Sequence, residues 1–162
     1  MELTDTLQRL LQSFERYYDV RTEGVAAPFA AEAEFHSHTE QYFLVKAAHL
    51  SDIDSNEYVF FALEPVLTCG RLAELSETAW NAGLSRVKPY MGHRNSDVSL
   101  IIIAERIDDD ALALVRRTRR SKSYKFGLYG WSNFRALAYE ASSERTASNR
   151  LGKNLRKLVR NV

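Results

Sequence analysis

The chain has 162 residues, of which 45% are hydrophobic and 27% charged, and its formal net charge is +1. This composition excludes a disordered chain and supplies enough apolar surface for one core, so we expect a single domain over residues 1–162. The single cysteine excludes an internal disulfide, and the longest apolar run, VSLIIIA, is too short to cross a bilayer. We therefore expect a soluble, cytoplasmic protein with no integral membrane association.

The first third of the chain predicts one helix followed by strands. Leucines and aromatic residues at spacings of three and four predict an amphipathic helix over 3–18. Polar and apolar residues then alternate, which predicts a hairpin of two strands, 29–36 and 41–49, with a turn near 37–40. The run EYVFFAL, which begins at Glu57, predicts a third strand.

The middle of the chain predicts two helices around a buried strand. Thr68 is a predicted N-cap, and Gly83 is expected to end the same helix. Residues 98–106 are apolar on both faces, which is typical of a central, covered strand. Asp108 is expected to cap the next helix, which begins with acidic residues and ends in RRTRR, as the helix dipole favours.

The last quarter predicts a second hairpin and a terminal helix. The runs YKFGLY and NFRALAYEA flank Gly130 and have the composition of paired strands. Apolar residues at helical spacing predict a helix from about Ser148 to the end of the printed sequence. The order of these elements predicts an α+β fold with a mixed or antiparallel sheet of about six strands flanked by helices.

Charge is divided unequally along the chain. Residues 1–115 hold 9 Lys or Arg against 19 Asp or Glu, whereas residues 116–162 hold 13 against 2. The split either marks an anion-binding surface or reflects two halves that neutralise each other across the fold. The predicted nucleic-acid or anion-binding residues are Arg116, Arg117, Arg119, Arg120, Lys122, Lys125, Arg150, Lys153, Arg156 and Lys157.

Aromatic residues follow the first part of this basic segment, in SKSYKFGLYGW. Cationic side chains beside aromatic rings suit phosphate contacts and base stacking. The alternatives are structural: arginines at a helix end complement its dipole, and aromatic residues at strand spacing commonly belong to the core.

The stretch AEAEFHSHTEQYFLVK, residues 31–46, carries the other candidate site. Its alternate residues place Glu32, Glu34, His36, His38 and Glu40 on one face of an extended strand. In the alternative interpretation Glu34, His36, His38 and Glu40 hold a metal ion, and Lys46 stabilises developing negative charge. A turn near 37–40 would break this shared face, so we expect a solvated surface rather than one compact site.

Other catalytic patterns carry less weight. Cys69 lies directly before a predicted helix, whose N-terminus would stabilise a reactive thiolate. The commoner alternative is that Cys69 is a buried, unreactive residue. The sequence contains no Gly-x-Ser-x-Gly elbow, P-loop, dinucleotide fingerprint or paired Cys-x-x-Cys. We therefore expect no catalytic residues and no cofactor.

Several blocks resemble a family of small uncharacterised bacterial proteins with no assigned activity. They are AEFHSHTEQYFLVK, SNEYVFF, SKSYKFGLYGW and SNRLGK, over about residues 32–153. The resemblance implies that these blocks share one fold, and it implies no function.

The predicted element order up to residue 120 is similar to that of the restriction-endonuclease-like fold. That family carries an acidic residue, one spacer and a lysine on a strand, and this sequence has no Asp-x-Lys or Glu-x-Lys. The third strand supplies Glu57 and Glu64 but no lysine. The resemblance therefore implies a rearranged or inactive site if that fold is present.

From these observations we expect a non-enzymatic binding or regulatory module whose basic C-terminal surface binds an anionic partner, either nucleic acid or an acidic protein. The alternative is a metal-dependent hydrolase or diverged nuclease with its site on the 31–46 hairpin. The sequence does not indicate an oligomeric state.

Overall fold

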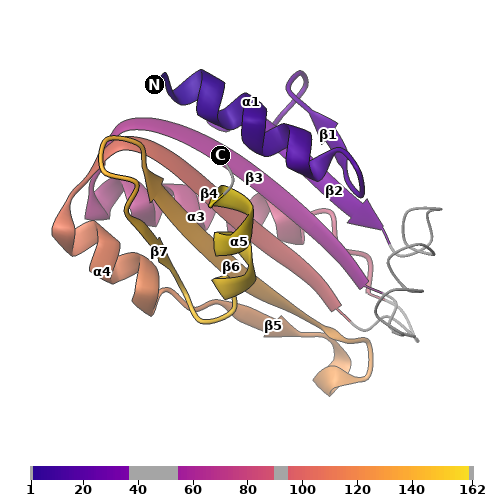
Figure 1. Ribbon diagram of the computed structural model, residues 1–162. Coiled ribbons are helices and arrows are strands. Elements are labelled where there is room, and N and C mark those ends of the chain that lie inside the picture. The colour runs from indigo at the N-terminus through magenta and orange to yellow at the C-terminus, as the bar shows by residue number, and fades with distance from the viewer. Residues whose placement is uncertain (1, 37–54, 90–94, 161–162) are drawn as a thin grey trace.

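An open, mixed β-sheet forms the centre of the protein in the computed structural model, which describes residues 2–36, 55–89 and 95–160 (Figure 1). The strands lie in the order β1, β2, β3, β4, β6 and β5, and β7 also pairs with β6. β3 and β6 run parallel to β4, and the remaining pairs are antiparallel. The strand bounds are β1 Asp19–Arg21, β2 Ala31–His36, β3 Ser55–Leu67, β4 Asn95–Ile107, β5 Ser121–Ser123, β6 Trp131–Glu140 and β7 Thr146–Ser148.

Helices cover both faces of this sheet. α1 (Leu3–Phe14) and α5 (Arg156–Val159) pack on one face, and α3 (Cys69–Leu84) and α4 (Asp109–Arg117) on the other (Figure 1). Side chains alternate between the faces along each strand, so the sheet separates two apolar clusters. The predicted α+β class with a mixed sheet is therefore confirmed, with seven described strands instead of about six.

Local signals placed the middle elements correctly. The Thr68 side chain accepts a hydrogen bond from the Arg71 N–H at 3.1 Å, so Thr68 is the N-cap of α3. β4 lies in the middle of the sheet with Ile101 and Ile102 buried on opposite faces, as its apolar character predicted. α4 begins after Asp108 as expected, but the Asp108 carboxylate accepts from Arg106 at 3.1 Å instead of capping the helix.

Several predicted boundaries are wrong. The first helix ends at Phe14 and not at residue 18. The run YKFGLY is not a strand, because residues 125–127 form a 3₁₀ turn between the short β5 and β6. The terminal helix does not begin at Ser148, which belongs to β7; a 3₁₀ turn (Lys153–Leu155) and the short α5 follow it.

The hairpin predicted around the 31–46 stretch is described only in its first half. β2 lies between β1 and β3, and Glu34 is opposite Asp19 on one side and Tyr58 on the other. The predicted second strand, 41–49, lies outside the described residues, as do His38, Glu40 and Lys46.

Candidate anion-binding site

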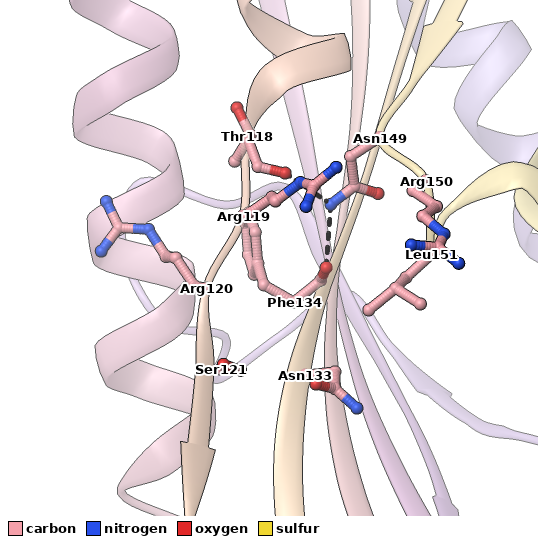
Figure 2. A pocket seen from close by; sticks show the side chains of 9 residues that line it. All are labelled: Thr118, Arg119, Arg120, Ser121, Asn133, Phe134, Asn149, Arg150 and Leu151. Carbon is pink, nitrogen blue, oxygen red and sulfur yellow. Dashed lines mark hydrogen bonds between the residues drawn. The ribbon is translucent and has the colours of Figure 1, made fainter.

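A cavity of about 280 Å³ opens where α4 ends and β5 begins. Three separate segments form its wall: residues 118–121, Asn133 and Phe134 of β6, and residues 149–151 after β7 (Figure 2). The volume lies near the ~300 Å³ lower end of ordinary small-molecule pockets, so the cavity suits a small group better than a large cofactor.

Asn149 holds the three segments together, and it is 2% exposed. Its Nδ2 donates hydrogen bonds to the carbonyl oxygens of Thr118 at 3.1 Å and Phe134 at 2.9 Å. Its Oδ1 accepts from the backbone N–H groups of Ala136 at 3.0 Å and Gly152 at 2.9 Å. Since two carbonyls face the amide nitrogen and two N–H groups face the oxygen, one orientation of the amide satisfies every partner.

Three of the predicted basic residues line this cavity: Arg119, Arg120 and Arg150. Figure 2 shows Arg119 reaching towards Asn149 with Arg150 on the other side, while the guanidinium of Arg120 points away from both. Arg119 and Arg150 are exposed, and neither forms an ion pair with any described residue. Two guanidinium groups without an ion-pair partner among the described residues therefore flank the cavity.

The charge split along the chain is not explained by ion pairing within the described structure. Among the basic residues of 116–162, only Arg135 and Arg145 pair with described carboxylates. Arg135 pairs with Glu57, and Arg145 pairs with Glu140 and Asp109. The remaining positive charge of this segment has no such partner. Among the described residues, ion pairing therefore neutralises only a small part of the excess.

The other seven predicted basic residues lie outside the cavity wall. Arg116 and Arg117 end α4, where they complement its dipole. Lys122 is in β5 with its Nζ 5.5 Å from the centre of the Tyr124 ring, and Lys125 is in the 3₁₀ turn that follows. The C-terminal members are Lys153, Arg156 and Lys157, in the last turns of the chain.

A second cavity, about 560 Å³, lies at the start of α4, but both of its arginines are already paired. Arg145 and Arg106 in its wall form ion pairs with Asp109 and Asp108, at 3.0 and 3.1 Å. An incoming anion would have to displace these carboxylates, so this cavity is a poorer anion site than the Arg119–Arg150 cavity.

The described part of the 31–46 stretch forms an ion-pair network. Glu32, Glu34 and His36 share one face of β2, and His36 Nε2 is 3.1 Å from Glu34 Oε2. Arg21 and Arg86 both pair with the two carboxylates.

The arginines in this network decide the ionisation of Glu32. Burial opposes ionisation of Glu32, but hydrogen bonds from Arg86, the Ala26 N–H and Arg21 outweigh it and lower its pKa. No described cluster contains three or more His, Cys, Asp or Glu side chains able to hold a metal ion. Because His38 and Glu40 lie outside the described residues, the metal-site alternative and the expected absence of one compact site both stay predictions.

The surroundings of Cys69 disfavour the interpretation of this residue as a reactive thiolate. Cys69 does begin α3, but burial and the nearby Asp110 carboxylate raise the pKa of its thiol. A raised pKa disfavours the thiolate, which is the nucleophilic form.

A buried polar network on the α1 face was not predicted from the sequence. The Glu57 carboxylate accepts hydrogen bonds from Tyr18, from Ser99 Oγ at 2.6 Å and from Arg135 at 2.5 Å. Asp97 lies opposite Glu57 in the sheet, and its Oδ1 is buried with no hydrogen-bond partner in the described structure. Burial, followed by the charge of Glu57, raises the pKa of Asp97.

The fold and site define an α+β protein with an open mixed sheet and an arginine-lined cavity. The chain belongs to a family described as a domain of unknown function, DUF8052, whose model matches residues 2–161. This confirms the resemblance to a family without an assigned activity. Comparisons with curated proteins and with solved structures found no match, so the similarity to the restriction-endonuclease-like fold stays a prediction. None of the described helices has both the length and the apolar character needed to span a bilayer.

Proposed function

We propose that the protein is a binding module that holds a phosphate-bearing anionic partner in the cavity between Arg119 and Arg150. The observation that carries the proposal is the position of these two arginines, which flank one cavity without a described carboxylate partner. A guanidinium presents several N–H donors in a plane, which matches phosphate oxygens better than an ammonium does.

The rest of the cavity suits such a group. Thr118, Ser121 and Asn133 supply neutral polar side chains, and Leu151 supplies an apolar edge. A cavity with guanidinium groups on two sides and hydroxyl or amide groups elsewhere in its wall can hydrogen-bond a phosphate without a metal ion. The unpaired basic residues outside the cavity add a positive potential that attracts polyanions, of which nucleic acid is one.

Binding of an anion in this cavity requires no chemical step. The described residues of the cavity wall include no carboxylate, histidine or cysteine, so they supply no general base or strong nucleophile. This composition favours binding over catalysis at this position.

Calorimetric titration of the protein with inorganic pyrophosphate at low salt tests the proposal. The wild-type protein is expected to bind, and Arg150→Gln to weaken binding about 10- to 100-fold, because a hydrogen bond to a charged group contributes about 1.5–3 kcal/mol. Arg9→Gln is the matched control, since Arg9 is an exposed arginine on α1, away from the cavity. Equal binding by Arg150→Gln and Arg9→Gln would show that the cavity is not the site.

A further inference from the structure

The ribbon formed by β5 and β6 ends in an exposed aromatic tip. Phe126 is fully exposed, Leu128 is 76% exposed and Trp131 is 41% exposed. Large apolar side chains this open to water, grouped within six positions, are typical of a surface that binds something.

The tip is a defined turn. The carbonyl of Tyr124 accepts hydrogen bonds from the N–H groups of Gly127 at 3.0 Å and Tyr129 at 3.1 Å, and Tyr124 N–H donates to Gly130 at 2.9 Å. Within it, Lys125 and Phe126 have φ angles of +50° and +54°, which residues with side chains rarely adopt. A backbone held in this conformation while it displays a phenylalanine to solvent is the kind of outlier that points to function.

The tip is positively charged as well as aromatic. Lys125 lies next to Phe126, and Lys122 lies two residues before Tyr124, over whose ring its Nζ is placed. The Tyr124 hydroxyl is 2.8 Å from the Ser132 hydroxyl, which ties the start of the turn to β6. Cations and an open aromatic face therefore occur together.

β5 connects this tip to the arginine cavity. Arg119 and Arg120 directly precede β5, Ser121 lies in the cavity wall, and the turn begins after Ser123. At about 3.3 Å per strand residue, Ser121 and Tyr124 are separated by about 10 Å. One extended polyanion can therefore contact both ends of β5 at the same time.

We propose that the partner is single-stranded nucleic acid, which stacks a base on Phe126 while its backbone follows β5 and places a phosphate in the Arg119–Arg150 cavity. This inference rests on the proposed function and adds the identity of the partner. Single strands are favoured over duplexes because only unpaired bases expose their faces for stacking. A lipid surface would use Phe126 and Leu128 together with charges around the tip, whereas Arg119 and Arg150 lie at the opposite end of β5.

Fluorescence anisotropy with a labelled single-stranded oligonucleotide tests this inference. A length of about 12 nucleotides is suitable, because domains that bind single strands cover ~4–16 nucleotides. Phe126→Ser is expected to weaken binding about 5- to 150-fold, the range for loss of one base–aromatic stack. Leu128→Ser is the matched control from the same turn, since an aliphatic side chain has no flat ring to stack, and it should bind like wild type. Phe126→Trp should retain binding.

Three outcomes would overturn the inference. In the first, Phe126→Ser binds the oligonucleotide as tightly as wild type; in the second, the protein binds no single strand at low salt. Alternatively, Phe126→Ser and Leu128→Ser both lose binding to vesicles of phosphatidylcholine and phosphatidylserine, which assigns the tip to a lipid surface. In each case, pyrophosphate binding that is still lost in Arg150→Gln leaves the proposed anion site standing, so the two proposals fail separately.

Discussion

Asn149 donates a hydrogen bond from Nδ2 to the main-chain carbonyl of Thr118 at 3.1 Å, across 31 positions of the chain. This contact fixes the end of α4 to the loop that follows β7. Because Arg119 directly follows Thr118 and Arg150 directly follows Asn149, the same bond sets the relative position of the two arginines proposed to hold the anion.

Replacement of Asn149 by alanine is expected to destabilise the protein by about 2–3 kcal/mol. The change removes four hydrogen bonds, and a buried group left without its partner costs ~1–3 kcal/mol, part of which water entering the open cavity recovers. Urea unfolding measures the effect. Asn133→Ala, in the same cavity wall, should change stability by less than about 0.5 kcal/mol, as is usual for partly exposed sites. Equal effects of the two substitutions would contradict the role given to Asn149.

Gly152→Ala is expected to disturb the same region by steric overlap. A Cβ at Gly152 would lie 2.6 Å from the Ala136 carbonyl oxygen and 2.8 Å from Asn149 Oδ1, and the backbone oxygen cannot move away alone. Gly70→Ala is the matched control, because nothing lies within 4 Å of its added Cβ in the first turn of α3. We expect Gly152→Ala to lower the thermal midpoint, and Gly70→Ala to raise stability by about 0.5–1 kcal/mol. A midpoint unchanged by Gly152→Ala would show that the loop has room to adjust.

Asp97 predicts a specific pH dependence of stability. Burial and then Glu57 raise the pKa of Asp97 in the folded protein, so the folded state binds this proton more tightly than the unfolded chain, where the pKa is about 3.9. Its contribution to stability is therefore present below pH ~3.9 and is lost as the pH rises through the folded-state pKa.

Asp97→Asn removes this titration. Relative to the variant, the wild-type unfolding free energy should fall as the pH rises from about 4 through the raised folded-state pKa of Asp97. Urea unfolding of both proteins at several pH values measures the difference. Two curves that stay parallel across this range would rule out a raised pKa at Asp97.

Glu140 predicts the opposite sign. Hydrogen bonds from Arg145, opposed by burial and helped by Ser143 and the Ile107 N–H, lower the pKa of Glu140 from 4.5 to about 2. The stability this carboxylate contributes is present above pH 4.5 and lost as the pH falls towards 2. Glu140→Gln should therefore unfold at lower urea than wild type at pH 7, and the gap should narrow on acidification. A gap that is independent of pH would contradict the assignment.

Elements with local signals were predictable from the sequence, whereas short paired strands were not. Thr68 caps α3 through its own neighbouring turn, and β4 has two apolar faces because both are covered, so each leaves a pattern in the chain. β1 and β7 have three residues each and form by pairing with β2 and β6, and such short strands carry no measurable periodicity.

The terminal helix shows how a periodic pattern misleads. Leu151, Leu155 and Val159 recur every four residues, which predicts a helix through all three. Pairing of residues 146–148 with β6 and the hydrogen bonds of Asn149 hold the preceding chain to the sheet, so α5 is restricted to Arg156–Val159. Tertiary contacts here override the helical spacing.

The candidate site was predictable in composition but not in geometry. A cluster of arginines and lysines is visible in the sequence, but its members have different roles: Arg119 and Arg150 line a cavity, while Arg135 neutralises the buried Glu57. Asn149 has no local signal, since all its side-chain partners except Gly152 lie at least 13 positions away.

The most direct test of the central claim is a map of backbone amide shifts during titration of ¹⁵N-labelled protein with pyrophosphate. We expect saturable shifts centred on Ser121, Arg150 and Leu151 in the cavity wall, with the amides of α1 unchanged. Shifts spread evenly over the basic C-terminal surface, or centred away from these residues, would contradict a defined anion site at the Arg119–Arg150 cavity.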